Sequence, residues 1–139
     1  MINWLEKHNK VSWTITLIIA ITIFIMSSIS FKSSSNLFEI KTITYHFLAF
    51  FFLCFFLSIS LTKGKKTNLI PLSIIFSILY GISDEIHQLF VPNRYFAISD
   101  ILTDTAGILT SAFIYLILIR SYHNKSKKDK EDYSIVSFY

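Results

Sequence analysis

The sequence predicts an all-α membrane protein, a bundle of four transmembrane helices with both termini in the cytoplasm. Hydrophobic residues make up 53% of the 139 residues and charged residues only 16%, whereas an average soluble domain carries roughly 25% charged residues. The charged residues separate long apolar segments. The 14 Phe, 7 Tyr and 2 Trp suit a bilayer, where aromatic rings lie in the core or at its interfaces. A chain of this length has room for one domain.

The first two helices are predicted from uncharged segments. Residues 11–31 and residues 42–62 contain no Asp, Glu, Lys or Arg. Each segment matches the roughly 20 residues that an α-helix needs to cross about 30 Å of hydrocarbon. A cleavable signal peptide is the alternative for the first segment, but the apolar core of such a peptide is usually only about 7–15 residues long. We therefore expect two membrane-spanning helices.

The third and fourth helices are predicted from apolar segments that contain acids. The third spans residues 68–91 and stops before Pro92, and the fourth spans residues 98–119. Proline ends a helix because it has no backbone N–H to donate. The acids in these two segments are Asp84, Glu85, Asp100 and Asp104.

The basic residues predict the orientation. With four spans, both termini and the link between the second and third helices lie on one side of the membrane. Only Lys32, Lys41 and Arg94 of the 13 basic residues fall on the other side. Short loops rich in Lys and Arg stay in the cytoplasm. The expected parts are a cytoplasmic N-terminus at residues 1–10, a four-helix transmembrane domain at 11–120, and a mobile cytoplasmic tail at 121–139.

Ionisable residues inside the predicted helices form a polar layer. A charge in the bilayer core is costly, so such residues usually face the bundle interior and pair with one another. The second helix begins, the third ends and the fourth begins on the same side of the membrane. The topology therefore places their polar residues roughly 5–10 Å below the outer interface. The layer comprises His46, Asp84, Glu85, His87, Gln88, Asp100 and Asp104, with Arg94 in the short link beside it.

Two interpretations of this layer stay open. It is either a structural network that fixes helix packing or an outward-facing site, for which all of these residues are ligand-binding candidates. Arg94 either caps the carboxylates or binds an anionic ligand, since a guanidinium group binds phosphate or carboxylate through paired hydrogen bonds. Candidates for a catalytic role are His46, Glu85 and Asp100.

Two segments of the chain resemble the VanZ-like family of small membrane proteins. Residues 83–94 (SDEIHQLFVPNR) and 99–107 (SDILTDTAG) are similar to the family's D-E-x-x-Q segment, its P-G-R turn and its D-x-x-x-N-x-x-G helix start. His46 and Phe47 are similar to the family's H-F-x-x-Y element. The resemblance covers roughly residues 42–119.

The resemblance also identifies which positions agree with the family and which depart from it. The positions that fall on the family's signature are His46, Glu85, Gln88, Arg94, Asp100 and Gly107. The departures are Asn93 where the family often has Gly, Asp104 where it usually has Asn, Phe50 where it has Tyr, and Ile43 where a Lys often stands.

The resemblance implies a multi-pass protein of the cell membrane with a role in the cell envelope. The namesake of the family is associated with resistance to the glycopeptide antibiotic teicoplanin. Under this hypothesis the polar layer binds an anionic headgroup, a lipid-linked precursor or an antibiotic-like molecule, and it needs no cofactor. The expected partners are membrane lipids, and the oligomeric state stays open.

Two further hypotheses stay open. A metal-dependent intramembrane hydrolase or transferase would act on a lipid phosphate, with carboxylates holding a divalent cation such as Mg²⁺ or Mn²⁺; no metal ligand is assigned. A proton- or ion-coupled carrier would use acids and histidines as a relay, but four helices make a thin wall unless the chain forms a homo-oligomer. Nucleic acid is not an expected partner, because most basic residues mark loops and the tail without aromatic rings on which bases could stack.

Overall fold

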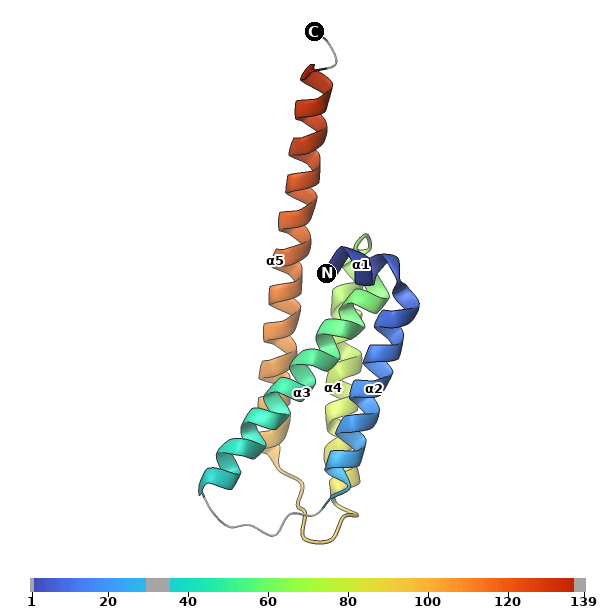
Figure 1. The fold of residues 1–139 in the computed structure, drawn as a ribbon. Coiled ribbons are helices and arrows are strands. Elements are labelled where there is room, and N and C mark those ends of the chain that lie inside the picture. The colour runs from blue at the N-terminus through green and yellow to red at the C-terminus, as the bar shows by residue number, and fades with distance from the viewer. Residues whose placement is uncertain (1, 30–35, 137–139) are drawn as a thin grey trace.

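A computed structural model shows the chain as a bundle of long helices (Figure 1). It describes residues 2–29 and 36–136, and the side chains of residues 4–29, 40–122, 124 and 125. In chain order the elements are α1 (Ile2–Lys7), α2 (Asn9–Ser27), α3 (Asn36–Thr62), the short 3-10 helix η1 (Thr67–Leu69), α4 (Ile70–Gln88) and α5 (Ile98–Val136). The described part of the chain contains helices and no strand.

Four of these helices are long and apolar enough to cross a membrane. The spans are Asn9–Ser27, Ile40–Thr62, Thr67–Gln88 and Ile98–Tyr122. Large apolar side chains such as Leu17, Phe76 and Phe113 lie more than half exposed on the outside of the bundle, as expected where the surrounding solvent is lipid. The predicted all-α fold class with four membrane-spanning helices is confirmed.

Two helices extend beyond the apolar segments that predicted them. α3 begins at Asn36, and α5 continues to Val136 through most of the polar tail. No proline or glycine follows Gly107 before Val136, and the Lys and Glu residues of the tail are good helix formers. The tail is therefore helical as far as Val136, while its mobility stays a prediction. Lys32 and the end of the first predicted segment lie outside the described residues.

α3 is the central helix of the bundle. It packs most extensively against α5 and also against α2 and α4, and α4 packs against α5. At Gly107 of α5 an added Cβ atom would meet the carbonyl oxygen of Phe47 and the backbone nitrogen of Phe51. Small residues permit this close approach of two helix backbones.

The two ends of the bundle differ. One end carries α1, the link between α3 and η1, and the long extension of α5 (Figure 1). The other end carries the link between α4 and α5, and there α3 diverges from α2 (Figure 1). The predicted polar layer belongs to this second end, where α4 stops and α5 starts.

We expect Gly107→Ala to lower the free energy of unfolding by about 1–3 kcal/mol, because the added carbon meets backbone atoms that cannot rotate away. The measurement is the thermal unfolding midpoint of the protein in detergent. Thr110→Ala, on the exposed face of the same helix, is the control and leaves the midpoint unchanged. A Gly107→Ala protein as stable as the wild type would show that α3 and α5 do not approach this closely.

Candidate functional site

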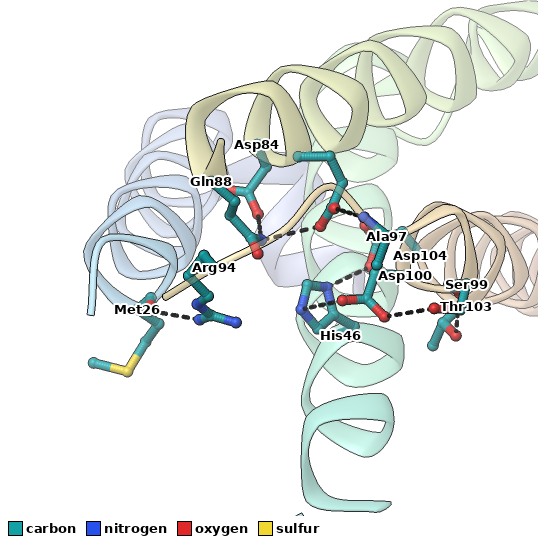
Figure 2. Close-up of polar contacts among 11 residues, drawn as sticks. Met26, His46, Asp84, Gln88, Arg94, Ala97, Ser99, Asp100, Thr103 and Asp104 are labelled. Carbon is teal, nitrogen blue, oxygen red and sulfur yellow. Dashed lines mark hydrogen bonds and ion pairs between the residues drawn. The ribbon is translucent and has the colours of Figure 1, made fainter. Parts of the chain in front are cut away.

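His46 of α3 lies between two carboxylates of α5 (Figure 2). Its Nδ1 atom is 3.0 Å from Oδ1 of Asp104, and its Nε2 atom is 3.7 Å from Oδ2 of Asp100. The two acids are four residues apart on α5, so they share one face of that helix, one turn apart. His46 is 3% exposed and Asp104 is 2% exposed. The imidazole therefore joins α3 to α5 inside the bundle.

Glu85 of α4 holds the link that leads into α5. The side chain is fully buried, and its Oε2 atom accepts a hydrogen bond of 2.9 Å from the backbone N–H of Ala97. The amide of Gln88 donates to Oε1 of Glu85 at 3.0 Å and to Oδ2 of Asp84 at 3.1 Å. Gln88 thus satisfies two neighbouring carboxylates from within its own helix.

Three of the predicted residues converge closely enough to bind one ion. His46, Glu85 and Asp100, from α3, α4 and α5, each offer one ligand atom, and these atoms all lie within 4.8 Å of one another. The Nδ1 atom of His46 is occupied by Asp104, which leaves Nε2 free to ligate. A histidine that ligates a metal usually donates its other nitrogen to a carboxylate in this way. The donor set, one nitrogen and carboxylate oxygens, fits a divalent cation.

Arg94 lies beside this cluster without capping it. Its Nη2 atom donates to the carbonyl oxygen of Met26 on α2 at 3.4 Å (Figure 2), and its Nε atom is buried without a hydrogen-bond partner. Within residues 2–29 and 36–136, no ion pair joins Arg94 to an acid of the cluster. The sequence left two roles open for Arg94, capping the carboxylates or binding an anionic ligand. The structure does not show Arg94 capping the carboxylates.

The turn that carries Arg94 uses a left-handed residue. Asn93 has φ 61, a conformation that asparagine tolerates better than most residues. The position is the one where the VanZ-like pattern often has glycine, so the chain keeps the backbone geometry of the turn with a different residue.

His87 is the one predicted ligand-binding residue that the structure places elsewhere. Its Nε2 atom lies 3.0 Å from the hydroxyl of Ser28, and its ring stacks on Phe24 with centroids 4.6 Å apart. His87 follows Glu85 by two residues, about 200° around α4. It therefore faces α2, away from the carboxylates that surround His46.

Buried hydroxyl groups in the other half of the bundle were not anticipated. Ser58 of α3 lies 2.6 Å from Ser73 of α4, and Thr62 lies 2.5 Å from the hydroxyl of Tyr115, which in turn donates to Glu6 of α1. Serine and threonine hydroxyls often bond across membrane helices. The signal in the sequence was their spacing, since Ser58 and Thr62 are four residues apart on one face of α3.

The comparison with family models agrees with the resemblance found in the sequence. The model of the VanZ/LLP1 family matches residues 6–119, a range that includes every candidate site residue. The comparison with curated proteins and the comparison with solved structures found no match.

We expect Asp104→Ala to lower the free energy of unfolding by about 1–3 kcal/mol, because it leaves the buried Nδ1 atom of His46 without a partner. Asp104→Asn keeps a side-chain oxygen at the same place and should retain most of the stability. The thermal unfolding midpoints of both proteins in detergent test this. Midpoints of both variants equal to that of the wild type would show that the contact with His46 contributes nothing.

Proposed function

The chain belongs to the VanZ/LLP1 family, and we propose that it is a cell-envelope protein that binds the anionic headgroup of a membrane amphiphile. Its four membrane-spanning helices make it a multi-pass membrane protein. The amphiphile would be a lipid, a lipid-linked cell-wall precursor or a glycopeptide of the teicoplanin type, and binding it would lower susceptibility to such antibiotics.

The observation that carries this proposal is the state of Arg94. Its guanidinium group is partly buried and has one long hydrogen bond to a carbonyl oxygen, and its Nε atom has no partner among the described residues. A buried polar group without a partner is costly. A phosphate or carboxylate would satisfy it through charge-assisted hydrogen bonds.

Each of the surrounding acids has a partner other than Arg94, although the Oδ2 atom of Asp104 has none among the described residues. His46 lies against Asp100 and Asp104, and Gln88 donates to Asp84 and Glu85. None of these contacts uses Arg94, so its guanidinium group stays available to an anion.

The proposal places the site at the outer surface of the membrane. The opposite end of the bundle carries Lys63, Lys65 and Lys66 in the link after α3, and Arg120 near the end of the span in α5. Cytoplasmic loops carry the excess of Lys and Arg. The end with Arg94 then faces outward.

Arg94→Ala should abolish the protection that the wild-type chain gives a sensitive host against teicoplanin, because it removes the cation that binds the headgroup. The measurement is the minimum inhibitory concentration, with the amount of inserted protein checked in isolated membranes. Arg120→Ala removes a basic residue at the other end of α5 and should leave the protection unchanged. Wild-type protein that is inserted and gives no protection would contradict the proposal.

A second candidate function is a metal-dependent hydrolase or transferase acting on a lipid phosphate. It is favoured by the convergence of His46, Glu85 and Asp100 within 4.8 Å and by the carboxylate of Asp104 behind the histidine. A divalent cation held there would polarise a phosphate. Arg94 would orient the same phosphate, so the two candidates share a ligand chemistry and differ in whether a bond is broken.

Metal binding distinguishes the second candidate. At a free Mn²⁺ or Mg²⁺ concentration about 100 times its Kd, the free energy of unfolding should rise by about 2.7 kcal/mol. Glu85→Gln should remove this effect, whereas Asp84→Asn, at the adjacent position outside the converging set, should keep it. If the thermal unfolding midpoint does not change when Mg²⁺, Mn²⁺ or Zn²⁺ is added, this candidate function is excluded.

A further inference from the structure

An apolar groove lies between α2 and α3. Its volume is about 320 Å³, within the size range of small-molecule sites. The wall from α2 includes Ile19, Thr22 and Ile23, and the wall from α3 includes Tyr45, Ala49 and Phe52.

The outer end of the groove meets the polar site. Tyr45 belongs to the groove, and its ring packs edge-on against the imidazole of His46, with centroids 5.7 Å apart. Ile23 lies almost one turn before Met26, whose carbonyl oxygen accepts the hydrogen bond from Arg94. Arg94 therefore lies near the outer end of the same two helices that enclose the groove (Figure 2).

The direction of the groove matches that of a lipid chain. From Tyr45 to Phe52 the wall of α3 runs about 10 Å at 1.5 Å per residue. The span of α3 starts at Ile40, so the groove starts near the headgroup level and runs toward the centre of the bilayer. An amphiphile bound by its headgroup at Arg94 would have its hydrocarbon chain on this path.

We propose that the groove between α2 and α3 binds the hydrocarbon chain of the ligand whose anionic headgroup binds at Arg94. This inference rests on the proposed function and narrows its ligand to an amphiphile with a phosphate or carboxylate headgroup and an extended chain. A free anion and a neutral lipid would each satisfy only half of the site. Because lipid tails already surround the protein, the groove contributes fit and orientation rather than hydrophobic driving force.

The test is a titration of the full chain in neutral detergent micelles with dodecyl phosphate, methyl phosphate and dodecanol. Binding is measured by the rise of the thermal unfolding midpoint with probe concentration. Ala49→Trp fills the groove, Ala106→Trp places the same side chain on the exposed face of α5, and Arg94→Gln removes the charge of the headgroup site.

Dodecyl phosphate should bind to the wild type and to Ala106→Trp alike, and about tenfold or more weakly to Ala49→Trp. Methyl phosphate, which has no chain to place, should bind equally to the wild type and to Ala49→Trp. Arg94→Gln should bind neither dodecyl phosphate nor methyl phosphate. Dodecanol should not compete with dodecyl phosphate.

The outcomes separate the two proposals. If Ala49→Trp binds dodecyl phosphate as the wild type does while Arg94→Gln does not, the groove inference is overturned and the headgroup site stands. If Arg94→Gln binds both phosphates normally, the proposed function is overturned. Competition by dodecanol would show that the chain binds without the anionic headgroup, which overturns the restriction of the ligand to an anionic amphiphile.

Photolabelling of the wild type covers the case in which Ala49→Trp does not fold. A dodecyl phosphate with a diazirine in its chain should label residues 19–23 and 45–52, and unlabelled dodecyl phosphate should suppress this labelling. Labelling that is instead spread over exposed faces such as Ile75 and Leu79 of α4 would overturn the inference.

Discussion

Burial of ionisable groups between membrane-spanning helices is the constraint on which this structure depends. A charged side chain there needs a partner, and the central partner is His46, whose ring contacts Asp104 and Asp100 at once. These contacts join α3 to α5, and Glu85 joins α4 to the backbone at Ala97. The polar network thus holds three helices together at the end where α3 diverges from α2.

The same network surrounds the place where we propose a binding site. In a purely structural network, Arg94 would be expected to form an ion pair with the neighbouring acids. Among the described residues it forms none with them. Arg94 lies between α2 and the cluster (Figure 2), and Tyr45, which lines the apolar groove, packs against His46 of the cluster. A charged group at the headgroup level with an apolar surface below it is what an anionic amphiphile requires, and this combination links the proposed headgroup site to the proposed chain-binding groove.

Much of the fold followed from the spacing of charges along the chain. Four apolar segments predicted four spanning helices, and alternating topology placed His46, Glu85 and Asp100 at one depth, where the structure brings them within 4.8 Å. The same reasoning grouped His87 with them, because a wide polar arc on one helix does not show which neighbour each residue faces. His87 instead contacts Phe24 of α2 and Ser28, the residue that follows this helix.

By itself the sequence determined the number of spans, their order and the depth of the polar residues, because hydrocarbon thickness and the cost of buried charge act on each segment separately. Only the tertiary structure decided which groups meet. The contact of His46 with Asp104, the uncapped state of Arg94 and the groove beside Tyr45 each depend on how α2, α3 and α5 rotate and diverge. Those rotations follow from side-chain packing between helices, which no single segment encodes.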